Sequence, residues 1–259
     1  MTALVATQVR ALARRSVRRT IRQPANIAFA LIFPLLLLAV NSGGLRSVTN
    51  LPGFPTDNYL DFFIAFTFVQ GALFATINSG TDLAKDIQTG FLNRLALTPL
   101  RRAGLLAGHL AGAVFMGAVQ ALVYLCVGLA EGVRIEAGFP GALVILALAA
   151  LITLGFAALG TFLALRTGTG EAVQGMFPLF FILLFLSSMA LPRNLIETDW
   201  FREIATYNPV SYMIEAIRSL IIEGWNAEAL ALGFGITAAF TVAALALAAA
   251  ALRTRLTRT

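Results

Sequence analysis

The feature that most constrains this chain is a series of six long apolar stretches. A helix needs about 20 mostly apolar residues to cross a bilayer, because every backbone amide must find its partner inside the segment once water is absent. Only 12% of the 259 residues are charged and 58% are hydrophobic, whereas soluble domains carry roughly 25% charged residues. We therefore expect an all-α membrane protein whose six transmembrane helices occupy nearly the whole chain as a single domain, 1–259. The expected spans are residues 25–45, 58–81, 104–130, 140–165, 172–191 and 228–252.

Basic residues gather at alternate gaps between these spans. Fourteen of the 19 lysines and arginines precede the first span, lie between spans two and three or four and five, or follow the last span. Cytoplasmic segments carry an excess of basic residues, so we expect both termini in the cytoplasm, with 253–259 as a cytoplasmic tail. The net charge of +6 could also indicate a nucleic-acid partner. We expect none, because the arginines flank apolar spans instead of covering a polar fold.

The first 23 residues have the pattern of an amphipathic helix. Arginines recur every four residues on one side, while valine, leucine and isoleucine fall near another. Such a helix suits the membrane interface, with guanidinium groups among lipid phosphates. The alternative is a solvated arm that only sets topology. The arginines of the repeat are Arg10, Arg14, Arg18 and Arg22.

The gap between spans two and three, residues 81–102, is longer than a turn requires. Its apolar residues recur at near-helical spacing, Gly90 can break the helix, and Pro99 ends it. A projecting amphipathic segment of this kind is a candidate docking surface for another protein. The residues that carry this prediction are Asp86, Gly90, Phe91, Asn93, Arg94, Leu95, Pro99 and Arg101.

A second short amphipathic segment, residues 207–225, precedes the last span. Asn208 can cap a helix that begins at Pro209, and Glu215 and Arg218 are three residues apart and can pair. The segment is too short and too charged to cross the bilayer, so we expect an outer re-entrant or interfacial helix.

Together these two segments resemble the permease subunits of the ABC-2-type transporter family, especially its daunorubicin-exporter-like branch. In that family the first segment reads acidic, Gly, acidic-Arg-hydrophobic, then Pro and Arg. This chain has Asn93 where the family often has an acid. The second segment matches an Asn-Pro followed by the Glu-Ala-hydrophobic-Arg step, which here ends at Arg218.

The resemblance implies a multi-pass permease subunit in a bacterial inner membrane. It implies a second permease subunit, as a homodimer or a heterodimer, and a separate ATPase subunit that uses ATP and Mg. This chain would bind no cofactor or metal itself and would export its cargo by alternating access. The many phenylalanines of spans two and five suit a hydrophobic or amphipathic cargo such as a drug, lipid or glycoconjugate.

What the sequence lacks favours this interpretation over two others. No Gly-Lys-Ser/Thr loop for nucleotide phosphates occurs, and Lys85, the single lysine, precedes Asp86. An ion-coupled multidrug transporter would normally carry acids or histidines near the bilayer midplane, where these spans have almost none. An intramembrane hydrolase would need a nucleophile and base, and no GxSxG, HExxH or paired-aspartate motif appears. We therefore expect no catalytic residues.

Overall fold

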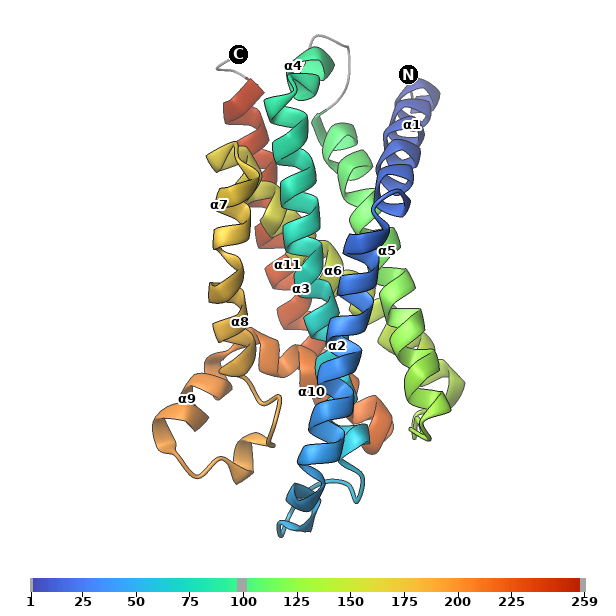
Figure 1. Ribbon diagram of the computed structural model, residues 1–259, viewed down its shortest axis with the longest axis vertical. Coiled ribbons are helices and arrows are strands. Elements are labelled where there is room, and N and C mark those ends of the chain that lie inside the picture. The colour runs from blue at the N-terminus through green and yellow to red at the C-terminus, as the bar shows by residue number, and fades with distance from the viewer. Residues whose placement is uncertain (1, 97–101, 257–259) are drawn as a thin grey trace.

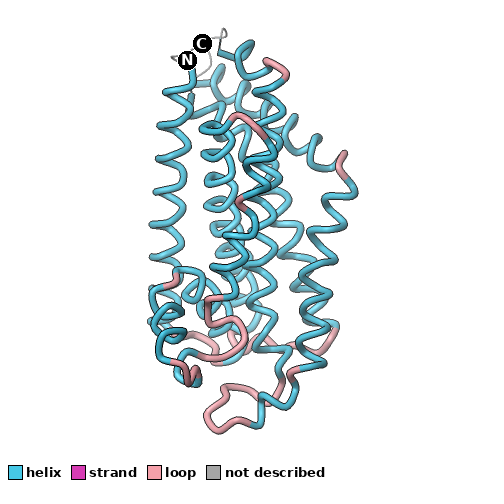
Figure 2. The backbone as a smooth tube through the Cα atoms, turned by 60° about the vertical axis from the view of Figure 1, so that its left-hand side comes forward, coloured by secondary structure: helices cyan, strands magenta, loops and turns pink. Residues whose placement is uncertain are grey.

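A computed structural model describes residues 2–96 and 102–256 of the chain, apart from the side chains of residues 2–6, 8, 93 and 96, and the described part contains helices and loops but no strand. The helices form an elongated bundle along one axis (Figures 1 and 2). Their bounds are α1 Thr2–Ile21, α2 Pro24–Gly44, η1 Arg46–Asn50, α3 Tyr59–Gln88, α4 Phe91–Ala96, α5 Arg102–Ala130, α6 Gly138–Thr167, α7 Gly170–Gly175, α8 Phe177–Phe185, η2 Arg193–Leu195, α9 Asp199–Tyr207, α10 Pro209–Ile222 and α11 Ala227–Leu256.

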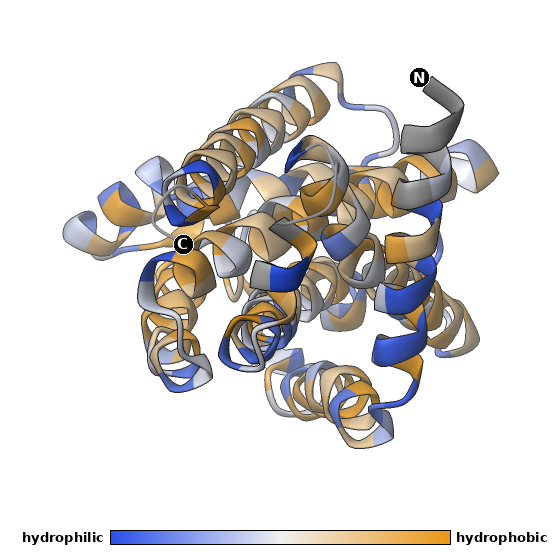
Figure 3. Cartoon of the chain, turned by 90° about the horizontal axis from the view of Figure 1, so that it is seen from above, coloured by the Kyte–Doolittle hydropathy of each residue, from blue (hydrophilic) through white to orange (hydrophobic). Residues whose placement is uncertain are grey.

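Five of the described helices are long and apolar enough to cross a membrane: α2, α3, α5, α6 and α11, with 21 to 30 residues each. They coincide with the first four expected spans and the last one. Seen along the bundle (Figure 3), hydrophobic residues also cover outward-facing parts of these helices. On α2, for example, Phe29, Ile32 and Val40 are each more than half exposed. An apolar exterior of this extent is typical of a multi-pass membrane protein.

The expected fifth span, 172–191, is not one continuous helix. It consists of α7 with 6 residues and α8 with 9, separated at Met176. Pro178 explains the break, because it lacks the N–H that would continue the helix and its ring crowds the carbonyl four residues earlier. The two pieces together extend about 24 Å at ~1.5 Å per residue, short of the ~30 Å hydrocarbon core. The structure therefore does not confirm a count of six spans.

The centre of the bundle is the contact between α3 and α6. A Cβ on Gly160 would lie 1.9 Å from the carbonyl oxygen of Thr76, and one on Gly80 would lie 2.8 Å from the carbonyl oxygen of Gly160. The two backbones can approach this closely only because neither glycine has a side chain. Around this contact α3 is almost entirely buried, with α2, α5, α7 and α10 also packed against it.

The glycine ridge of the third expected span also serves internal packing. Gly108 and Gly112 of α5 lie against Leu12 and Ser16 of α1. The Ser16 hydroxyl donates to the carbonyl of His109, 2.7 Å away, and accepts from the amide of Gly112 at 3.2 Å. Residues 2–21 are thus helical as expected, and one face of α1 packs on α5, whereas its placement in the membrane interface stays a prediction.

The phenylalanines of span two do not form an outer surface. Phe62, Phe63 and Phe66 are at most 1% exposed and belong to the core. In span five Phe180 is also buried, whereas Phe185 is 47% exposed. The phenylalanines of span two are therefore buried inside the subunit and give no support to the expected hydrophobic cargo.

We predict that Gly160→Ala destabilises the bundle, because the new methyl group would meet backbone atoms of α3 that cannot move independently. Overpacking of this kind costs about 1–3 kcal/mol, so the purified variant should unfold at a lower temperature in detergent. Gly235→Ala is the matched control, since nothing lies within 4 Å of its Cβ position. An unchanged unfolding temperature for Gly160→Ala would contradict the close contact.

Candidate functional site: the charged end of the bundle

One end of the bundle gathers α1, the last turns of α3, the short helix α4 and the start of α5 (Figure 1). The C-terminal end of α11 lies at the same end. This is where the sequence predicts a docking surface. It is also where the chain places most of its described ion pairs between helices distant in sequence.

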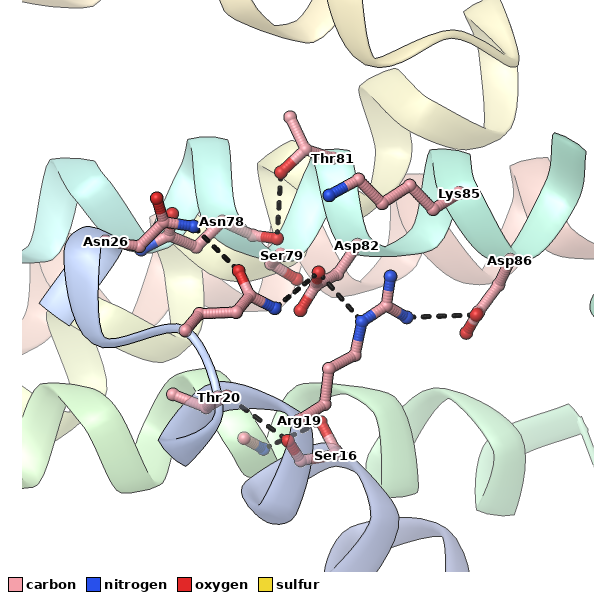
Figure 4. A network of polar contacts seen from close by, with 12 residues as sticks. Ser16, Arg19, Thr20, Asn26, Asn78, Ser79, Thr81, Asp82, Lys85 and Asp86 are labelled. Carbon is pink, nitrogen blue, oxygen red and sulfur yellow. Dashed lines mark hydrogen bonds and ion pairs between the residues drawn. The ribbon is translucent and has the colours of Figure 1, made fainter. Parts of the chain in front are cut away.

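Two arginines of α1 and two aspartates of α3 form a network of ion pairs, and Figure 4 shows Arg19 between Asp82 and Asp86. Arg15 binds Asp86 with both terminal nitrogens, at 3.0 and 2.8 Å. Arg19 bridges the two acids, with Nη1 2.9 Å from Asp86 and Nε 2.9 Å from Asp82. Gln23 adds a hydrogen bond to Asp82 at 3.2 Å. The two arginines are four residues apart on α1, and the two aspartates are four apart on α3, so each set projects from one face of its helix.

Arg15 also connects this network to α4. Its guanidinium carbon lies 3.9 Å from the centre of the Phe91 ring, a favourable cation–π arrangement. The hydrogen bond to Asp86 raises the pKa of Arg15 above its ordinary value, outweighing the opposing effect of partial burial. Arg15 therefore keeps its charge throughout the physiological pH range.

Gly90 separates α3 from α4. Its φ of +69° is in the left-handed region, which residues with a Cβ rarely adopt and glycine adopts readily. This conformation explains the expected break at Gly90. Leu92 then points inward and is only 2% exposed, in a cluster with Leu83 and Leu105. Leu95 packs against the same cluster, and Arg94 is exposed.

The structure thus brings several predicted site residues together and gives them partners within the chain. Asp86 pairs with α1, and Phe91 and Leu95 are partly buried against the bundle. Asn93 has no described side chain, and Pro99 and Arg101 lie outside the described residues. The docking role of these residues stays a prediction.

Three further members of this site, Arg15, Arg19 and Asp82, were not predicted from the sequence. A signal was present in the spacing: two acids lie four residues apart in the basic gap between spans two and three, and arginines near the N-terminus are also four apart. Helical periodicity places each pair on one face. Periodicity does not say which two faces meet, because more than 60 residues separate the arginines from Asp86.

A small polar cavity of about 30 Å³ lies beside the network, between the α1–α2 turn, α3 and α5. Its lining includes Gln23, Asn78, Asp82 and His109. The Nε2 atom of His109 is 3.1 Å from both the hydroxyl and the carbonyl oxygen of Ser79. The histidine is therefore satisfied by α3, and the cavity is large enough for about one water molecule.

The other predicted segment forms α10. Asn208 caps it as expected, since its side-chain oxygen accepts from the amide of Val210 at 3.0 Å and Pro209 is the first helical residue. The same side chain donates to the carbonyls of Leu183 and Leu186, at 2.6 and 3.0 Å. One residue thus fixes the start of α10 to the end of α8.

The expected pair between Glu215 and Arg218 does not form. Glu215 instead forms an ion pair with Arg193 from the preceding loop. Arg218, 6% exposed, donates to the carbonyls of Phe62, Ser188 and Met189 at 3.1 to 3.3 Å, and its guanidinium lies 3.4 Å from the centre of the Phe62 ring. Three neutral carbonyls take the place of a carboxylate, so this buried arginine joins α10 to α3 and to the loop after α8.

Among the described residues, no group of three or more His, Cys, Asp or Glu side chains could hold a metal ion. Cys126 is exposed, with its thiol unbonded to another cysteine. The chemistry of the site is thus that of ion pairs and packing between helices.

The long apolar helices define the class of multi-pass membrane proteins, and comparison with known proteins gives the family. Residues 7–222 match the ABC-2 type transporter family. The chain therefore belongs to the ABC-2 type transporter permease family.

Its relatives include drug-resistance permeases. The chain is 31% identical to the daunorubicin resistance ABC transporter permease protein DrrB1 of Streptomyces coeruleorubidus, over 64% of this chain and 59% of that protein. It is 27% identical to the probable doxorubicin resistance ABC transporter permease protein DrrC of Mycobacterium tuberculosis, over 81% of this chain and 75% of that protein. It is 31% identical to the putative transport permease ycf38 of Pyropia yezoensis, over 85% of this chain and 76% of that protein.

We predict that Asp86→Asn loosens α1 from the bundle. The substitution removes the charge that holds Arg15 and Arg19, and hydrogen bonds to a charged group contribute about 1.5–3 kcal/mol each. Hydrogen–deuterium exchange of the α1 amides should therefore accelerate about tenfold, with α6 unchanged. Asp199→Asn serves as the control, because its pair with Arg202 is local and exposed. Equal protection of α1 in the wild type and the Asp86 variant would show that the ion pairs do not hold the helix.

Proposed function

We propose that this chain is the membrane-spanning subunit of an ATP-driven ABC-2-type exporter that moves a hydrophobic or amphipathic molecule outward. The observation that carries the proposal is membership of the ABC-2 type transporter family together with similarity to permeases named for drug resistance. Such permeases work with ATPase subunits. ATP and Mg would act on that partner, and a second permease subunit, identical or related, would complete the pathway for alternating access.

We place the ATPase contact at the charged end of the bundle. There α4 projects beyond α3 and presents the exposed Arg94, while Phe91 contacts Arg15 on α1. A force applied to α4 would be transmitted to α1 through this contact and to α3 through the Asp86 pair. This end would face the cytoplasm of a bacterial cell, with both chain termini, as the distribution of arginines indicates.

The outer end would be built around α10. The proposal that α10 is re-entrant rests on its burial against α3, α6 and α11 and on its 14-residue length, which is too short for a crossing. Arg218 of α10 would then fix the outer ends of α3, α10 and the loop after α8 to one another.

We predict that Arg94→Glu weakens co-purification of the permease with its ATPase subunit about tenfold, equal to ~1.4 kcal/mol. Arg94 is preferable to Phe91 and Leu95 for this test, because those two also pack against the permease itself. Arg46→Glu, an exposed arginine in η1 at the opposite end of the bundle, is the charge-matched control. Normal assembly of the Arg94 variant would remove α4 from the docking surface.

Transport should depend on ATP and not on an ion gradient. In inside-out vesicles containing the permease and its ATPase, we predict that accumulation of a fluorescent amphipathic drug requires ATP and persists when a protonophore collapses the proton gradient. The permease without the ATPase should neither accumulate drug nor hydrolyse ATP. Accumulation that needs the gradient and ignores ATP would favour the alternative, an ion-coupled secondary multidrug transporter.

A further inference from the structure

A large open groove of about 1270 Å³ runs along the bundle where α5, α6 and α11 meet. It is separate from the charged network, because it lies on a different face of α5 from the one that packs on α1. Alanines create its depth, since a methyl group leaves room that a larger side chain would fill. The alanines that line it are Ala103, Ala107 and Ala111 from α5 and Ala246 and Ala249 from α11.

The groove has the length of one lipid leaflet. Its lining extends from Arg102 to Phe115 on α5, about 20 Å at ~1.5 Å per residue. Half of the hydrocarbon core is about 15 Å thick. Leu106, Leu110 and Leu154 form an apolar floor, so an acyl chain would find hydrocarbon along its length and a headgroup would extend beyond it.

The headgroup end of the groove is positively charged. Arg102 begins α5 and Arg253 is near the end of α11, and both exposed side chains line the groove at the charged end of the bundle. The described residues that line the groove include no Asp or Glu. An anion placed there would therefore meet two guanidinium groups, which bind phosphate oxygens with paired hydrogen bonds.

We propose that this groove binds one anionic phospholipid, with its phosphate between Arg102 and Arg253 and an acyl chain over the alanines. Basic pockets between membrane helices are suited to such headgroups. A second copy of the chain fits the groove less well, because a twofold interface would bring the same arginines of both copies together. The bound lipid would join the start of α5, directly after the predicted docking segment, to the end of α11. The proposal depends on the membrane setting and not on the transported cargo or the ATPase.

The test is native mass spectrometry of the purified full-length chain, titrated with phosphatidylglycerol or phosphatidylcholine of the same acyl chains. The wild type should retain phosphatidylglycerol preferentially. Arg102→Gln with Arg253→Gln should weaken that binding about 30-fold, since the two arginines near a lipid surface contribute about 1 kcal/mol each. The control is Arg46→Gln with Arg134→Gln, which removes the same charge from exposed positions outside the groove.

A steric variant tests the groove independently of charge. Ala107→Phe with Ala246→Phe fills the space and should reduce binding of both lipids, whereas Ala243→Phe, exposed on α11 outside the lining, should not. The proposal would be overturned by equal losses of lipid binding in the arginine variant and its charge control, or by full lipid binding after the groove is filled. Conversion of a dimer to a monomer by the phenylalanines would also overturn it, because a second copy of the chain would then be the occupant. The lipid-binding measurement does not depend on transport, so unchanged ATP-driven transport in these variants would not contradict the lipid site. Failure of transport in the wild type would contradict the proposed function and not the lipid site.

Discussion

The contact between α3 and α6 is the interaction on which the rest of the structure depends. Gly160 lies against the backbone of Thr76, and Gly80 lies against Gly160 and Val173. In an apolar surrounding the hydrophobic effect does not drive helices together, so close packing must supply the attraction. Because these two backbones meet without side chains between them, α3 becomes the buried axis around which the other long helices are arranged.

Arginine side chains then attach the amphipathic helices to this axis. At one end Arg15 and Arg19 hold α1 on Asp82 and Asp86 of α3. Near the other end Arg218 holds α10 on the carbonyls of α3 and of the loop after α8. Both devices use arginine, whose planar guanidinium can donate to several acceptors at once. Both helices also pack on the bundle, α10 in the core and α1 on α5, and the directed hydrogen bonds of the arginines fix them to α3.

The sequence predicted some local features of these sites and not their partners. Asn208 caps α10 and Gly90 breaks the chain between α3 and α4, because capping and a positive φ are decided within a few residues. Glu215 and Arg218 looked equally local at a separation of three. Their partners are instead Arg193 and three distant carbonyls, since burial favours the acceptors that packing places nearby. The docking residues from Asp86 to Arg101 stay a prediction, with α4 now seen to pack partly on its own bundle.

The sequence by itself determined the helical membrane class, five long helices and their approximate bounds, and the family, because apolar length and helical periodicity are properties of contiguous residues. Only the tertiary structure decided that the fifth apolar stretch is two short helices, that the phenylalanines of α3 are core, and that Asp86 pairs with α1. It also decided that alanines from α5 and α11 border one groove. These outcomes depend on which helix faces meet between residues far apart in the sequence. The spacing of residues identifies a helix face but does not identify the face that packs against it.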